Sequence, residues 1–290
     1  MEAENEPQPN PRRKLFFGLF IFPLLIAVGM ALLLCTVVFL TNEEETPESL
    51  ITAIKTGSPS KRWQKAFELS NELNRNPATI RNEGVMKEVI HILRDTTHYD
   101  PKTRAYMSLA LSYFHNPQAA AALHESLVND QNNEVQLYVL WALGVVQSKE
   151  AISDILSFLK SENPQLRKMA AYVLGVLGDP QTVPSLTPLL EDPVEDIRWN
   201  ASLSLARLGN DSGWQILAKM LDRSILSANH MNDEEIEKVM INAAKGLALT
   251  KREETVPILE TLSKEDKSLK VRQAAIEAME YLKQPQEYIR

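Results

Sequence analysis

The chain has 290 residues, of which 44% are hydrophobic, so it is long enough to bury a large core. Its formal net charge of −7 excludes the clustered basic footprint with which nucleic-acid-binding domains neutralise phosphates. A single cysteine, Cys35, excludes an intrachain disulfide and a cysteine-based metal site, and the five histidines show no metal-ligand spacing, so we expect no metal, no cofactor and no catalytic centre.

The first predicted element is an apolar run, residues 15–40, which holds 26 consecutive residues without a charge. As a helix it would be about 39 Å long, more than the roughly 30 Å hydrocarbon core of a bilayer. A cleaved signal peptide is the alternative, but its apolar region spans only about 7–15 residues before a small-residue cleavage site. Residues 36–40 offer no such site, so we predict an uncleaved transmembrane helix.

The charges on either side of this run predict its orientation. Arg12, Arg13 and Lys14 precede the run, whereas Glu43, Glu44 and Glu45 follow it. The positive-inside rule then makes residues 1–14 a cytoplasmic tail of a single-pass protein in the inner (cytoplasmic) membrane. Residues 41–47 form a linker, and residues 48–290 form a periplasmic or otherwise extracytoplasmic domain. The lipid bilayer is thus a predicted partner through residues 15–40.

A helical pattern recurs along the remainder of the chain. It reads apolar–Arg–x–x–apolar–x–x–Ala–Leu–x–x–apolar, and its first position falls on Thr103, Val135, Leu166, Ile197, Val239 and Val271. The intervals are 32, 31, 31, 42 and 32 residues. A fixed period of this size is typical of a solenoid, in which stacked units bury a shared core. Asp-Pro and Asn-Pro pairs at 100–101, 116–117, 163–164, 179–180 and 192–193 predict helix starts, because the side chain caps and proline needs no N–H partner.

The repeats resemble a known family. Residues 191–201 (Glu-Asp-Pro-Val-Glu-Asp-Ile-Arg-Trp-Asn-Ala), residues 163–171 and residues 270–275 are similar to the HEAT repeat signature in its short bacterial, phycobilisome-lyase-type form. The resemblance covers about residues 48–285. It implies an all-α fold, a right-handed α-solenoid of about seven HEAT-like helical pairs, preceded by the one transmembrane helix.

The second position of the pattern carries a basic residue in four repeats: Arg104, Arg167, Arg198 and Arg272. In the HEAT pattern this arginine pairs with an acid of the neighbouring turn. A functional basic ladder is one interpretation, but ion pairs that brace successive repeats are the interpretation we favour. Gln136 and Met240 replace the arginine in the other two repeats.

Two departures from the pattern mark candidate binding surfaces. Positions 3 and 7, which line the concave face of HEAT stacks, carry Leu137, Trp141, Lys168, Tyr172, Trp199 and Leu203 in the three central repeats. Such a stripe either anchors a partner or fills gaps between helices, because amphipathic rings serve both purposes. The 42-residue interval adds about ten residues near 222–233, predicted as a long turn capped by Asn232 or Asp233, which is either a contact or a neutral insertion.

Three enzyme classes share HEAT-like scaffolds, and none fits this sequence well. Bilin lyases act in the cytoplasm, deoxyhypusine hydroxylase needs several His-Glu pairs where this chain has only His124-Glu125, and HEAT-type DNA glycosylases need a basic groove. We therefore expect a protein that is not an enzyme but a membrane-anchored scaffold for another protein of the cell envelope. An assembly or binding factor for a cofactor-carrying or electron-transfer protein is the second hypothesis. A lyase-like enzyme acting in the concave groove is the third.

Overall fold

The computed structural model describes residues 17–41, 46–75 and 82–283. The chain divides into two compact units, Met1–Thr46 and Pro47–Arg290. The predicted cytoplasmic tail, the charges that flank the apolar run (Arg12–Lys14 and Glu43–Glu45) and most of the predicted linker lie outside the described residues.

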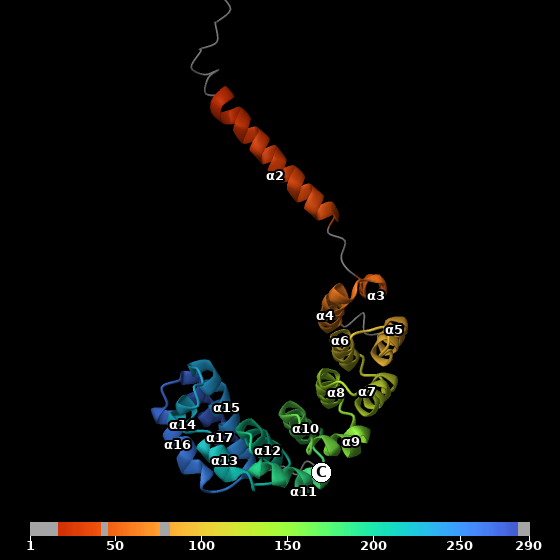
Figure 1. The fold of residues 1–290 in the computed structure, drawn as a ribbon. Coiled ribbons are helices and arrows are strands. Elements are labelled where there is room, and N and C mark those ends of the chain that lie inside the picture. Colours follow the sequence, from red (N-terminus) through yellow and green to blue (C-terminus); the bar gives the residue numbers. More distant parts are fainter. Residues whose placement is uncertain (1–16, 42–45, 76–81, 284–290) are drawn as a thin grey trace, which may run out of the picture. The chain divides into compact units, whose positions relative to one another are not determined.

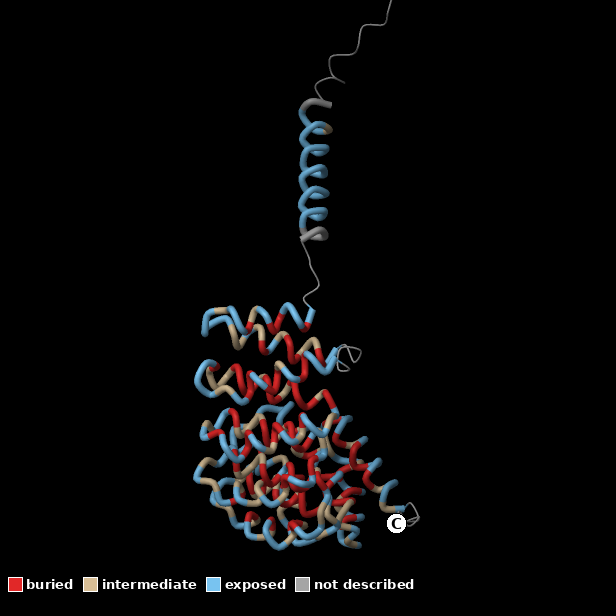
Figure 2. The backbone as a smooth tube through the Cα atoms, turned by 90° about the vertical axis from the view of Figure 1, so that its right-hand side faces the viewer, coloured by how far each residue is buried: buried red, intermediate tan, exposed pale blue. Residues whose placement is uncertain are grey.

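The first unit contains one long apolar helix. A π-helical turn, Phe17–Ile21, leads into α2, Phe22–Thr41. Pro23 lies in the first turn of α2, directly after the π-helical turn. Residues Leu19–Val37 are long and apolar enough to cross a membrane, a property that a signal sequence shares. Every side chain of this stretch is exposed or nearly so (Figure 2).

The described residues of the second unit form a stack of seven helical pairs, as the repeat pattern predicts (Figure 1). The outer helices are α3 (Pro47–Thr56), α5 (Glu83–Arg94), α7 (Pro117–Asn129), α9 (Ile152–Phe158), α11 (Val183–Leu186), α13 (Trp214–Lys219) and α16 (Thr255–Glu265). The inner helices are α4 (Pro59–Arg75), α6 (Pro101–Ser112), α8 (Asn133–Val145), α10 (Pro164–Leu177), α12 (Glu195–Arg207), α15 (Asp233–Thr250) and α17 (Leu269–Lys283). Each inner helix packs on the next, and the described residues contain no strand. The fold is therefore the predicted all-α solenoid.

The predicted helix starts are correct with one exception. Asp100, Asn116, Asn163 and Asp179 each cap a helical segment whose first residue is proline. The prediction at Asp192-Pro193 is wrong, because α12 begins two residues later, behind Val194. The Asp192 carboxylate instead accepts hydrogen bonds from the Val194 N–H and from Arg167, so the loop is extended by its bond to the preceding repeat.

Left-handed residues stop the inner helices at one point of the register. They stand twelve residues after the first position in the first five of the six repeats and are His115, Gln147, Gly178, Gly209 and Lys251, with φ between 44° and 73°. Glycine adopts this conformation without strain, whereas an L side chain there costs roughly 1–2 kcal/mol. The backbone is therefore strained at three of these five turns, those that carry His115, Gln147 and Lys251.

Small residues allow the inner helices to approach closely. Gly175 of α10 faces Ser204 of α12, and a Cβ atom added to Gly175 would lie 2.7 Å from the Ser204 Cα. Ala206 and Ala248 occupy the equivalent position of the next two inner helices and are buried. Figure 2 shows buried residues in helices throughout the stack, and they form two core clusters that divide at α12. The alanine-rich pattern of the sequence therefore reflects helix-to-helix packing.

Ion pairs join successive repeats along one edge of the stack. The Arg104 guanidinium lies 2.9 Å from Asp130 in the loop of the following repeat and donates to the Tyr99 carbonyl of its own loop, and both charged side chains are only 5% exposed. Arg167 repeats both contacts, with Asp192 at 2.9 Å and with the Ser161 carbonyl. These arginines brace adjacent repeats and do not form a free basic ladder.

The other members of the position-2 series behave differently. Arg198 pairs with Glu195 of its own helix at 3.6 Å and donates to the Asp192 carbonyl. Gln136, in the arginine position of its repeat, donates to the Asp130 carbonyl and so keeps the contact with the loop of its own repeat. Arg272 has no side-chain partner among the residues that the structure describes.

The insertion at 222–233 is more than the long turn that we predicted. It forms a short helix, α14 (Arg223–Ala228), followed by Asn232, which caps α15 together with Glu235 in a capping box. Arg223 of α14 reaches Asp266 in the next repeat at 2.7 Å. Because the position-2 residue of this repeat is Met240, the insertion supplies the arginine that the regular position lacks.

Removing one partner of the buried pair tests the role of these links. Arg104→Ala leaves the Asp130 carboxylate buried without its counter-charge, and we expect a loss of about 3–5 kcal/mol in unfolding free energy. The matched control is Arg94→Ala, which breaks an exposed inter-repeat pair with Glu125 and costs less than about 1 kcal/mol. Urea unfolding of the full chain in detergent, followed by circular dichroism, measures both. Equal losses in the two variants would contradict the bracing role.

Candidate functional site

The predicted stripe lies on three consecutive inner helices. Leu137 and Trp141 belong to α8, Lys168 and Tyr172 to α10, and Trp199 and Leu203 to α12. Tyr172 is 37% exposed, and the other five side chains are half-buried. The side chains therefore pack partly against the core and partly line the surface of the inner helices, which Figure 1 shows on the inside of the curved row of pairs.

A second aromatic group, which the sequence prediction missed, precedes this stripe. The Tyr106 ring of α6 lies 6.5 Å from Trp63 and 5.3 Å from Phe67, both on α4, and 5.8 Å from Tyr138 on α8 (ring centroids). Tyr106 and Tyr138 both occupy position 4 of the pattern, so the period could have identified them. Aromatic side chains thus follow the inner helices from α4 to α12.

One cation lies over the first ring of this series and another over Tyr172 on α10. The Lys102 ammonium is 3.4 Å from the Trp63 ring centroid, and the Arg207 guanidinium is 5.4 Å from that of Tyr172. Lys168 is engaged in an ion pair with Asp196 at 3.2 Å. Burial raises the pKa of Tyr138, and the adjacent Tyr106 adds to the effect, so the hydroxyl stays neutral. The surface therefore combines aromatic and aliphatic side chains with the Lys168–Asp196 ion pair, a composition that suits a protein ligand.

The insertion adjoins the C-terminal end of the stripe. Trp199 lines a notch of about 180 Å³ together with Ile216 and Met220 and with Ile225 and Leu226 of α14. Ile225 is 41% exposed. The two departures from the repeat pattern, which appear separate in the sequence, therefore meet at one place.

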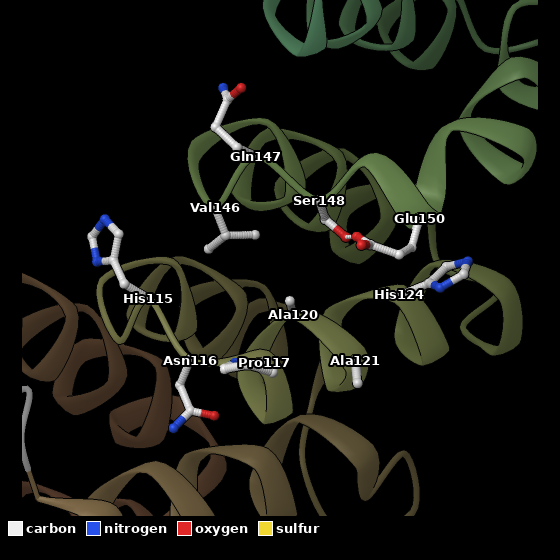
Figure 3. A pocket seen from close by; sticks show the side chains of 10 residues that line it. All are labelled: His115, Asn116, Pro117, Ala120, Ala121, His124, Val146, Gln147, Ser148 and Glu150. Carbon is white, nitrogen blue, oxygen red and sulfur yellow. Dashed lines mark hydrogen bonds between the residues drawn. The ribbon is translucent and has the colours of Figure 1, made fainter. Parts of the chain in front are cut away.

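A larger pocket, of about 660 Å³, opens between the turns that follow α6 and α8 (Figure 3). His115 and Asn116 line one end of this pocket, and Ser148, Glu150 and His124 line the other. Two of the strained left-handed residues, His115 and Gln147, are in its lining. The Ser148 hydroxyl donates to Glu150 at 3.3 Å. No sequence signal pointed to this pocket, because it joins two turns 32 residues apart.

The single His-Glu pair of the sequence is occupied by ion pairs between repeats. The Nε2 atom of His124 lies 2.6 Å from Asp154, and Glu125 accepts from Arg94. Among residues 17–41, 46–75 and 82–283, no three His, Cys, Asp or Glu side chains gather where they could hold a metal ion.

Comparison with known proteins identifies the repeats. A family model for HEAT repeats matches residues 86–161 and 152–227. Residues 86–227 are HEAT repeats. Helical pairs continue on both sides of this segment, from α3 to α17.

Proteins with similar HEAT repeats are named for specific activities. The chain is 32% identical over 114 residues to the phycocyanobilin lyase subunit alpha of Nostoc sp., which covers 36% of this chain and 41% of that protein. It is 28% identical over 114 residues to the deoxyhypusine hydroxylase of Danio rerio, 39% of this chain and 37% of that one. The chain thus spans less than half the length of these curated relatives.

A solved structure confirms the architecture. The HEAT solenoid superimposes on a chain from the complex of CpcE and CpcF of phycocyanin lyase from Nostoc sp., with a TM-score of 0.57 and 18% identity, over 82% of this chain and 88% of that chain. At this identity the likeness shows the fold alone.

These names correct one expectation. The sequence led us to predict a protein that is not an enzyme, and that prediction is wrong, since the curated relatives of these HEAT repeats are named as a lyase subunit and a hydroxylase. The reasoning failed because a solenoid holds functional groups in space, so that residues far apart in the sequence contribute to one surface.

Proposed function

We propose that the protein binds another protein along its inner helices and presents this surface from a membrane. The observation that carries the proposal is the series of half-buried and exposed aromatic side chains from Trp63 on α4 to Trp199 on α12. Tyrosine and tryptophan are the favoured anchors of protein interfaces, and the notch beside Trp199 accepts an apolar side chain of the partner.

The membrane part of the proposal rests on the length and composition of Leu19–Val37 and on the basic residues Arg12–Lys14 that precede it. By the positive-inside rule the N-terminal tail is cytoplasmic and the solenoid extracytoplasmic, in the inner membrane of a bacterium. The partner is then a protein of the cell envelope.

Replacing the two central anchors tests partner binding. Trp141→Ala combined with Trp199→Ala should abolish co-purification of a stoichiometric partner from native membranes in mild detergent, because both rings lie on the proposed surface. Trp214→Ala is the matched control, since Trp214 lies on the outer helix α13. Helicity is checked by circular dichroism. Unchanged partner yield from a folded double variant would show that the stripe only fills gaps between helices.

Labelling of single cysteines tests the topology. In a Cys35→Ser background, Glu260→Cys on the exposed surface of α16 should react with a membrane-impermeant maleimide in intact cells, whereas Glu4→Cys should react only after lysis. Reaction of both or of neither before lysis would contradict the proposed orientation. Loss of residues 1–40 from the mature protein would identify a cleaved signal sequence instead.

A second candidate function is attachment or assembly of a cofactor on another protein. It is favoured by the 32% identity to a phycocyanobilin lyase subunit, which the protein-binding surface alone does not explain. Incubation of the purified chain with phycocyanobilin, followed by its visible absorption spectrum, distinguishes the candidates, since a scaffold leaves the spectrum of the free pigment unchanged.

A further inference from the structure

The last helix that the structure describes, α17, exposes a face that every earlier inner helix from α6 to α15 buries. Positions 6 and 10 of the pattern lie on this face. At position 6 the earlier repeats carry Ser108, Leu140, Ala171, Ser202 and Ala244, and at position 10 they carry Ser112, Gly144, Gly175, Ala206 and Ala248, all of them buried. Ten buried residues in five repeats define this face as the contact with a neighbouring helix.

In α17 the same two positions hold Ile276 and Glu280. Ile276 is 38% exposed, Glu280 is exposed, and Leu269 on the same side of the helix is 74% exposed. The large Glu280 side chain stands where Gly175 lets α12 approach α10, so a further repeat of the same kind cannot stack here as closely.

Arg272 lies at the border of this face. It occupies position 2, from which Arg104 and Arg167 reach an acid of the following repeat. No described residue offers Arg272 such a partner. Among the described residues, this face therefore has no apolar cover and Arg272 has no carboxylate partner.

The charges of this face are self-complementary. Arg272 and Glu280 stand four residues before and four residues after Ile276. Two copies of α17 packed antiparallel about Ile276 place Arg272 of each copy opposite Glu280 of the other. A two-fold interface requires this kind of reciprocal pairing.

We propose that α17 is a homotypic contact, at which a second copy of this chain packs antiparallel with the two Ile276 side chains on the axis. Glu280 of the second copy supplies the acid that Arg272 lacks. One helix face is smaller than the roughly 800 Å² per partner of a stable complex, so the contact is weak and concentration-dependent. It is independent of the proposed partner surface on the inner helices α4 to α12.

Cysteine cross-linking of the full chain tests the contact. In a Cys35→Ser background in native membranes, Ile276→Cys should form a disulfide-linked dimer several-fold faster than Tyr281→Cys. Tyr281 is the matched control, because it is 39% exposed on the same helix but lies on a different side of it. Equal rates at the two positions would indicate random collision and would overturn the proposal.

Charge exchange tests the register in the same assay. Arg272→Glu or Glu280→Arg alone should reduce cross-linking at position 276 several-fold, and the two substitutions together should restore it. If cross-linking of the double variant stays low, the antiparallel pairing is refuted.

The reactivity of Ile276→Cys separates two other outcomes. If Ile276→Cys neither cross-links nor reacts with a maleimide, residues of the same chain cover the face. If it reacts but stays monomeric, α17 is a solvated end of the stack. Both results would overturn the proposal.

Discussion

The bond between an arginine and an acid of the following repeat sets the register of this solenoid. Apolar helical pairs made largely of alanine and leucine pack closely, but these contacts are not directional. Arg104 with Asp130 and Arg167 with Asp192 add directional bonds between repeats, and each guanidinium also binds a carbonyl of its own loop. Burial of the Asp192 carboxylate raises its pKa. Its hydrogen bonds with Arg167 and the Val194 N–H, together with the charges of Arg167 and Arg198, outweigh this effect, so the pKa of Asp192 is lowered.

Where the regular arginine is absent, the chain restores the bond by other means. Arg223 on the inserted helix α14 replaces the interaction that Met240 cannot make, and its Asp266 partner is only 5% exposed. The insertion thereby serves two purposes, since α14 also forms a wall of the notch beside Trp199. The ion pairs at the loops and the small core residues together fix the register. The remaining surface of the inner helices can therefore carry aromatic side chains.

Much of the fold could be predicted from the sequence, and the errors share a physical cause. The 31-residue period and the Asn-Pro and Asp-Pro pairs are local signals, so they located the helical pairs and most helix starts. The start at Asp192 was wrong because Arg167, 25 residues away in the sequence, binds its carboxylate. The contacts of Tyr106 with Trp63 and Tyr138, and the meeting of α14 with Trp199, depend on the stacking of repeats. The residue pattern of a single helix does not show which side chains of neighbouring repeats come into contact.

The claim that these links hold the stack in register is tested most directly at the inserted arginine. A double-mutant cycle of Arg223→Met and Asp266→Asn, measured by urea unfolding, isolates the interaction between the two side chains from their separate packing. The account predicts a coupling free energy of about 1–3 kcal/mol, in the range of partners that share one buried network. Additive effects of the two substitutions would contradict it, because they would show that the insertion does not replace the missing arginine.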